Sequence, residues 1–302
     1  MPSKKLHDPE EVTGEPEGVL NLQNDFSDLE LLRTGLFTAA VPFDAPPEAK
    51  RRVLAAFTSY IWGNKSIDYT LKRHSDLWSA KRPSEEERAI FAALADAKQH
   101  VKAFESVILS FSQEDVSSGL VAAEACLVRL VASFQCASFL VRAGYHFEAA
   151  TICRLILEQF AWAMAIYDRD DDGIFELQPN SCIASLKALH PEAGQLYGQL
   201  SRLAHLHPDH QPEYIRLEDG RLRVLDQLPQ ARWTLVFILL NLADWYRTCG
   251  EFMTFKYVVK PEAIVRGSDG RLELASGRPF LTKVTLHARK AKALGVPIEV
   301  DA

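Results

Sequence analysis

The chain has 302 residues, which is enough for one large or two modest domains with a sizeable buried core. Its 34 Lys and Arg residues against 40 Asp and Glu residues give a formal charge of -6, which excludes a global electrostatic attraction to nucleic acid or to an anionic membrane. The five cysteines are odd in number and scattered, without a CxxC pair, which is typical of reduced thiols in a cytoplasmic protein.

Residues 1–46 are rich in Pro, Gly and acidic groups and predict a mostly irregular arm, with a short helix over 26–37. The amino terminus lacks the apolar central region of a signal peptide, so we expect that the protein is not secreted. From Pro47 the apolar residues recur at spacings of three and four. This period predicts a helical domain over 47–258.

Local signals mark where the helices of this domain begin and end. Ser84 followed by Glu87 is a capping-box pattern, which starts a helix that runs to about Phe111. The next helix carries an apolar stripe until Gly144 ends it, and another follows over about 147–167. Further helices are predicted over 181–189, 191–205 and 231–257.

Two hairpin signals interrupt the helical pattern. Apolar and polar residues alternate around Asp219-Gly220, which predicts a hairpin over about 212–226 inserted in the helical domain. Residues 259–302 predict a second hairpin and a short last helix. The sequence therefore predicts an all-α fold, a helical bundle with one or two small β-hairpins.

Two apolar segments are long enough to be weighed as membrane spans. Val121 to Val141 carries Glu124 and Arg129, and Trp233 to Leu242 is too short to cross a bilayer. We therefore expect both to be buried helices of a soluble bundle, with no membrane partner.

Arg154 and Glu158 lie four residues apart in a helix of otherwise core-forming residues, so they share a helix face. A guanidinium and a carboxylate in that setting need each other or a ligand, because taking each charge out of water costs several kcal/mol. This pair is therefore either a structural ion pair or part of a binding site.

Arg202, His205 and His207 form a second polar cluster at the end of the helix predicted over 191–205. Four residues separate Arg202 from His207, a spacing that lets an arginine hold a phosphate while a histidine transfers a proton. The alternative is an exposed helix C-terminus, where the helix dipole favours histidine.

The same segment spells HxHxDH, the zinc-ligand motif of metallo-β-lactamase-fold hydrolases, with His205, His207, Asp209 and His210. That fold needs a strand before the motif and later His and Asp ligands, whereas here the preceding residues are helical and His287 is the sole histidine downstream. We therefore expect no metal, and keep these four residues as candidates for a metal-dependent hydrolase. Glu-x-x-His pairs, a phosphate loop and a dinucleotide motif are absent, so we expect no cofactor.

Two stretches together carry a family pattern, Gly144-x3-Glu148-Ala149-x4-Arg154-x3-Glu158 and Tyr197-x2-Leu200-Ser201-x3-His205. This pattern resembles a HEPN-related family of uncharacterised bacterial proteins over about a third of the chain. The resemblance implies an all-helical, usually dimeric HEPN-like core. Many members of that superfamily are metal-independent ribonucleases of toxin-antitoxin and antiviral defence systems that use an R-x4-6-H motif.

The resemblance also implies roles for residues of the second cluster. Arg202 would stabilise the scissile phosphate, and His207 would move protons while the RNA 2′-hydroxyl attacks. Leu203 stands directly after Arg202, where the nuclease motif usually has a polar residue, and the match to the Leu-Ser and His pattern favours His205 over His207.

Three functions stay open at this point. The first is a HEPN-like protein that binds or cleaves RNA in a toxin or defence system, as a cytoplasmic homodimer with a partner protein or antitoxin. The second is a non-catalytic helical interaction or sensor module, in which Arg154 and Glu158 fix the geometry of the core. The third is a metal-dependent hydrolase centred on the HxHxDH segment. If the protein is an RNA-cleaving enzyme or a metal-dependent hydrolase, we expect the region of Arg154 and the region of His205 to lie close together in the fold.

Overall fold

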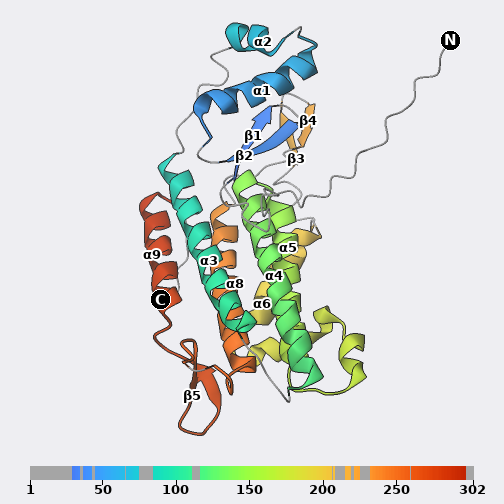
Figure 1. Ribbon diagram of the computed structural model, residues 1–302, viewed down its shortest axis with the longest axis vertical. Helices are drawn as coiled ribbons and strands as arrows, with labels where there is room; N and C mark the ends of the chain where they lie inside the picture. Colours follow the sequence, from blue (N-terminus) through green and yellow to red (C-terminus); the bar gives the residue numbers. More distant parts are fainter. Residues whose placement is uncertain are drawn as a thin grey trace, which may run out of the picture.

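The computed structural model shows a bundle of long helices with a smaller lobe at one end (Figure 1). The residues it describes are 29–34, 37–42, 45–64, 66–74, 84–110, 116–205, 207, 215–218, 221–224, 232–258 and 260–296. This architecture confirms the predicted all-α class, a helical bundle with small β-hairpins.

The bundle is built from the long helices α3 (Glu85–Leu109), α4 (Ser118–Ala143), α5 (His146–Ile166) and α8 (Arg232–Met253). Each of them packs against at least two of the others, and their apolar faces enclose one core. At its centre the ring of Tyr246 lies within 6.2 Å of the rings of Phe104, Phe134 and Phe160. Burying each such side chain contributes about 1.5–3 kcal/mol, so this core is what holds α5 in place.

The predicted helix boundaries are confirmed at the two positions with the strongest local signals. Ser84 Oγ accepts a hydrogen bond from the Glu87 N–H at 3.0 Å, and the Glu87 carboxylate accepts one from the Ser84 N–H at 2.8 Å. Gly144 ends α4 with a φ of 80°, a left-handed conformation that a residue with a Cβ adopts at a cost.

Shorter elements cover one side of α5. They are the 3-10 helices η3 (Asp172–Glu176) and η4 (Pro179–Ala188) and the α-helix α6 (Ala193–Ala204). Both η4 and α6 pack directly on α5. The segment predicted as a helix over 181–189 is thus helical, although with the tighter 3-10 geometry.

The lobe at the end of the bundle contains three pairs of elements (Figure 1). They are the strands β1 (Leu29–Thr34) and β2 (Phe37–Pro42), the helices α1 (Pro47–Trp62) and α2 (Ile67–Arg73), and the strands β3 (Ile215–Glu218) and β4 (Arg221–Val224). Strands β3 and β4 confirm the hairpin predicted over 212–226.

The irregular arm predicted over residues 1–46, with a helix over 26–37, is wrong for residues 29–34 and 37–42. These two segments form the antiparallel strands β1 and β2, in which Leu29 faces Pro42 and Thr34 faces Phe37. Helix α1 packs against this hairpin, and Leu32 and Ala55 are buried there. The tertiary cover from α1 stabilises a hairpin that two strands alone would not maintain in water. Residues 1–28 lie outside the described part of the chain.

The carboxy-terminal part folds back along the bundle. Strands β5 (Ile264–Arg266) and β6 (Leu272–Leu274) form the predicted second hairpin, and α9 (Pro279–Ala293) is the predicted last helix. Helix α9 packs on α3 and α8, where Asp96 accepts hydrogen bonds from Lys283 at 2.5 Å and from His287 at 2.8 Å. The described residues therefore contain three hairpins, one more than the sequence predicts.

Among the described residues, α4 and α5 are long and apolar enough to cross a membrane by length and composition alone. In their most apolar windows 50% and 56% of the residues are buried inside the bundle. Core helices of soluble proteins pass the same test, so these two helices are weak evidence for a membrane partner.

Candidate functional site

Arg154 lies at the centre of a polar cluster between α5 and α6. Its Nε donates to Glu158 Oε1 at 2.9 Å, its Nη2 donates to the Tyr197 hydroxyl at 3.1 Å, and its Nη1 lies 2.6 Å from His205 Nε2. The guanidinium carbon also lies 5.2 Å from the centre of the Tyr197 ring. The structure thus brings the two polar regions of the sequence together, and we call these four residues the Arg154 cluster.

The charges of this cluster are partly shielded from water. The side chains of Arg154 and Glu158 are 20% and 19% exposed. Burial lowers the pKa of Arg154, but the hydrogen bond to Tyr197 and the attraction of Glu158 outweigh it, so the pKa lies above its ordinary value. Arg154 is therefore a fixed positive charge that α5 holds against the end of α6.

His205 is the exposed member of the cluster, and it occupies the C-cap position of α6. A guanidinium N–H can only donate, so Nε2 of His205 accepts and the imidazole proton is on Nδ1. Within the described part of the chain no protein group pairs with that Nδ1–H. Arg154 therefore sets the tautomer of an imidazole that is open to solvent.

Sequence reasoning missed Tyr197 as a site residue, although its spacing gives a signal. Tyr197, Ser201 and His205 stand four residues apart in turn, so they line one face of α6. Ser201 Oγ is buried in this face and has no hydrogen-bond partner among the described residues. Buried hydroxyls are normally paired, so Ser201 is an open polar group beside the Arg154 cluster.

The remaining predicted residues lie at the C-terminal end of α6. Arg202 and His207 are exposed, and the His207 N–H donates to the Arg202 carbonyl oxygen at 3.0 Å. Asp209 and His210 lie outside the described residues. Among the residues that are described, no group of three or more His, Cys, Asp or Glu side chains is arranged to hold a metal ion. The hydrolase built on HxHxDH therefore stays a prediction.

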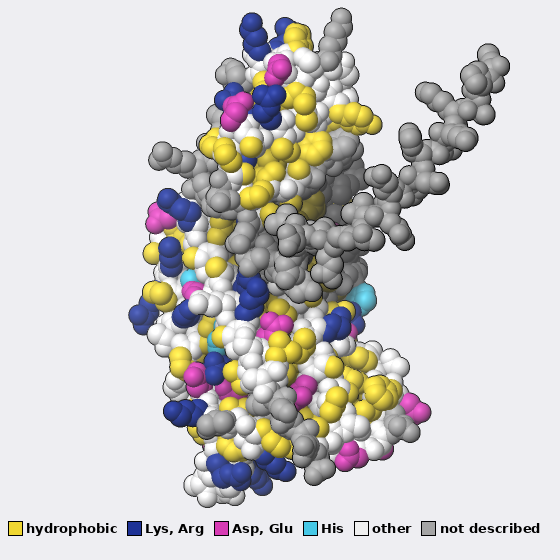
Figure 2. All heavy atoms as spheres, viewed as in Figure 1, with side chains coloured by type: hydrophobic (Ala, Val, Ile, Leu, Met, Phe, Trp, Pro, Cys, Tyr) yellow, Lys and Arg dark blue, Asp and Glu magenta, His cyan; other side chains and the backbone are white. Residues whose placement is uncertain are grey.

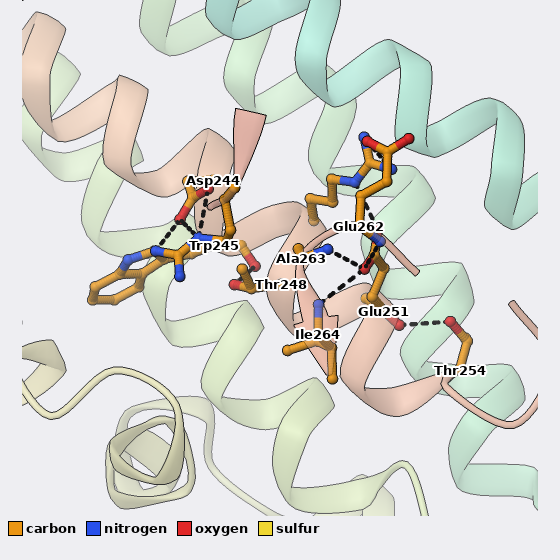
Figure 3. A network of polar contacts seen from close by, with 11 residues as sticks. Asp244, Trp245, Thr248, Glu251, Thr254, Glu262, Ala263 and Ile264 are labelled. Atoms are coloured by element: carbon orange, nitrogen blue, oxygen red, sulfur yellow. Dashed lines mark hydrogen bonds and ion pairs between the residues drawn. The ribbon is translucent and has the colours of Figure 1, made fainter. Parts of the chain in front are cut away.

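A second polar network lies along α8, and the sequence analysis did not find it. Figure 3 shows that the carboxylate of Glu251 faces the chain just before and at the start of β5. Its Oε2 accepts from the backbone N–H groups of Glu262, Ala263 and Ile264 at 2.9, 2.6 and 3.2 Å. Its Oε1 accepts from Arg247 Nε at 2.7 Å. This fully buried carboxylate anchors the β5–β6 hairpin to the bundle.

A cavity of about 230 Å³ lies between α3, α8 and α9, next to this network. Its cationic side chains already have carboxylate partners: Arg278 binds Asp244 at 3.1 Å, and Arg247 binds Glu262 at 3.0 Å. Burial raises the pKa of Asp244 despite the opposing effect of Arg278. The charges here neutralise one another, so this region serves as a structural framework rather than as a second candidate site.

The structure therefore brings Arg154, Glu158, Tyr197 and His205 into contact and leaves Arg202 and His207 exposed at the same helix end. The arrangement can bind an anion, because it places arginine and imidazole N–H groups at one surface. No model of a known protein family, no curated protein and no solved structure matches this chain.

Proposed function

We propose that this protein binds RNA at the α5–α6 face and cleaves it without a metal ion. The observation that supports this most is the chain of contacts from Glu158 through Arg154 to the exposed imidazole of His205. A shielded ion pair that orients an exposed histidine is an arrangement that phosphoryl-transfer sites use. The pairing of Arg202 with His207 at the R-x4-H spacing adds a cation and a second imidazole.

The proposed chemistry uses the contact between His205 and Arg154 and the position of Arg202 and His207 at the same helix end. His205 has its proton on Nδ1, so it donates a hydrogen bond to a phosphate oxygen instead of taking up a proton. His207 accepts the proton of the 2′-hydroxyl, whose oxygen bonds to the adjacent phosphorus. Arg202 stabilises the negative charge that develops on the phosphate. The 5′-oxygen leaves and takes the proton from His207, which gives a 2′,3′-cyclic phosphate and a free 5′-hydroxyl.

Metal-independent cleavage of RNA in the presence of EDTA tests this proposal. We expect the native protein to release fragments with 2′,3′-cyclic phosphate ends. His207→Ala should abolish release, since the proton acceptor is lost, and His205→Ala should slow it by about 10- to 1000-fold. Lys290→Ala, an exposed substitution on α9, is the matched control and should cleave like the native protein.

The outcomes separate catalysis from structure, provided that thermal unfolding shows each variant to be folded. Native protein that leaves RNA intact, or a His207→Ala variant that cleaves at the native rate, would contradict the proposed reaction. We further propose that the protein acts in the cytoplasm and forms a homodimer, as HEPN-like proteins of defence systems do. The homodimer would bind a partner protein such as an antitoxin. Sedimentation of the purified chain tests the dimer.

One observation favours a second candidate, a non-catalytic interaction or sensor module. Nε, Nη1 and Nη2 of Arg154 each already have a partner within the protein, so the guanidinium need not bind anything else. In that case Arg154→Ala and Glu158→Ala each lower the stability, and the double variant is no less stable than the worse single variant. RNA cleavage and the binding of RNA would then both be absent.

A further inference from the structure

Large apolar side chains are exposed at the end of α1 and on α2. They are Tyr60 (78% exposed), Ile61 (42%), Trp62 (54%), Ile67 (38%) and Tyr69 (50%), and we call them the α1–α2 tip. Single exposed apolar residues are normal on protein surfaces, whereas here five are exposed within ten residues. Tyr60 and Trp62 stand two residues apart on α1 and therefore point to different sides of that helix. The three most exposed members are aromatic.

The tip is held in a defined geometry. Helix α1 packs on the β1–β2 hairpin, and its residues Ala55 and Thr58 are buried. The turn into α2 is fixed by a hydrogen bond from Asn64 Nδ2 to Thr70 Oγ1 at 3.0 Å. The Trp62 ring meets the ring of His74, just after α2, edge to face at 4.8 Å. The aromatic side chains are therefore presented by a folded helix pair.

The charge of this segment differs from that of the whole chain. Residues 47–74 contain six Lys and Arg residues and two acidic residues, a formal charge of +4 in a chain with a formal charge of -6. On α2, Lys72 and Arg73 follow Tyr69 by three and four residues, so all three share a face and are exposed. Figure 2 shows Lys and Arg side chains next to hydrophobic ones over the upper lobe.

We propose that the α1–α2 tip binds single-stranded RNA, with bases stacked on Trp62 and Tyr69 and phosphates near Lys72 and Arg73. Exposed aromatic rings interleaved with cations are what sequence-tolerant binding of single strands requires. A second copy of this chain would bring like charges together, so a polyanion is the better fit. The aliphatic members, Ile61 and Ile67, are the least exposed, which favours stacking over insertion into a lipid surface.

This inference rests on the proposed function for the identity of the polymer. Helix α5 begins at the end of the bundle next to the lobe (Figure 1). Arg154 lies eight residues into α5, which corresponds to about 12 Å along the helix axis. Helix α2 lies at the far end of the lobe, and α1 lies between it and the bundle (Figure 1), so an RNA strand bound at the tip reaches the Arg154 cluster only by running along the lobe.

Fluorescence anisotropy with labelled 2′-O-methyl oligouridine, which lacks the attacking hydroxyl and is not cleaved, tests the tip on the full chain. We expect Trp62→Ala and Tyr69→Ala to raise Kd by roughly 5- to 100-fold each, the range for losing one stacked base. Phe175→Ala, which truncates an aromatic side chain that is 73% exposed on η3, is the control and should leave Kd unchanged. Replacing Lys72 and Arg73 by Ala should weaken binding and reduce its dependence on salt.

Two different measurements separate this inference from the proposed reaction. The Kd for an RNA that cannot be cleaved tests the tip, and the release of 2′,3′-cyclic phosphate ends tests the α5–α6 site. If the native protein binds RNA and the Trp62→Ala and Tyr69→Ala variants bind equally well, the tip is not the RNA surface, while the α5–α6 site still stands. If the native protein does not bind RNA but sediments with phosphatidylserine vesicles, the inference is overturned and the tip is a membrane-binding surface. Circular dichroism and thermal unfolding establish that each variant is folded.

Discussion

Replacing Glu251 by Ala should lower the free energy of unfolding by about 3–5 kcal/mol. The substitution removes the acceptor of three backbone N–H groups, of which those of Ala263 and Ile264 belong to buried residues. Leaving a buried donor unpaired costs about 1–3 kcal/mol, so these two groups account for most of the loss. Arg247 adds less, because it keeps its ion pair with Glu262 at 3.0 Å.

Urea denaturation followed by circular dichroism measures this loss. Glu262→Ala is the matched control, because its side chain is 54% exposed and its ion pair with Arg247 should be worth less than about 1 kcal/mol. Glu251→Gln keeps one acceptor oxygen and should fall between the two. If Glu251→Ala cost no more than Glu262→Ala, the carboxylate would not be the anchor of the β5–β6 hairpin.

Other properties of the core lead to two further predictions. Burial lowers the pKa of His100 to about 4 and that of His190 to about 3, whereas both titrate near 6.5 when unfolded. Between these pKa values the unfolded chain binds protons that the folded chain does not. The free energy of unfolding should therefore decrease as the pH falls below 6.5. His100→Phe should reduce the slope of the free energy of unfolding against pH by up to about 1.4 kcal/mol per pH unit. Gly250→Ala should lower the free energy of unfolding by about 1–3 kcal/mol, because the new Cβ would overlap the Phe104 ring. Gly198→Ala should raise it by about 0.5–1 kcal/mol, because the position lies inside α6 and has open space for a Cβ. Thermal unfolding of the two variants shows whether the two changes have opposite signs.

Signals that act within a few residues allowed the helices to be predicted from the sequence. The capping box of Ser84 and Glu87 depends on side chains three residues apart, and Gly144 ends α4 through its own backbone conformation. Both can be read without knowing what packs against the helix. The alternating pattern around Asp219-Gly220 is local in the same way, and it was confirmed as the β3–β4 hairpin.

Features that depend on distant partners could not be predicted. The β1–β2 hairpin is stabilised by packing against α1, which its own residues do not reveal, so these residues alone predict an irregular arm. One partner of Arg154 is His205, which stands fifty-one residues away at the C-cap of α6. The sequence predicts that the two regions meet, but it does not predict which atoms are in contact. Tyr197 was part of the family pattern, but only its hydroxyl contact with Arg154 identifies it as a member of the cluster.

The spacing Arg-x3-Glu occurs twice in these helices, and burial separates the two cases. Arg247 and Glu251 stand at the same spacing as Arg154 and Glu158, but Glu251 is fully buried and its remaining lone pairs are taken by backbone N–H groups. The backbone contacts of Glu251 lead to the buried residues Ala263 and Ile264, so this carboxylate holds the fold together. One contact of Arg154 leads to the surface, to the exposed imidazole of His205, whose Nδ1–H has no partner among the described residues. This exposed imidazole distinguishes the α5–α6 face from the Glu251 network, and it is why we place the proposed reaction there.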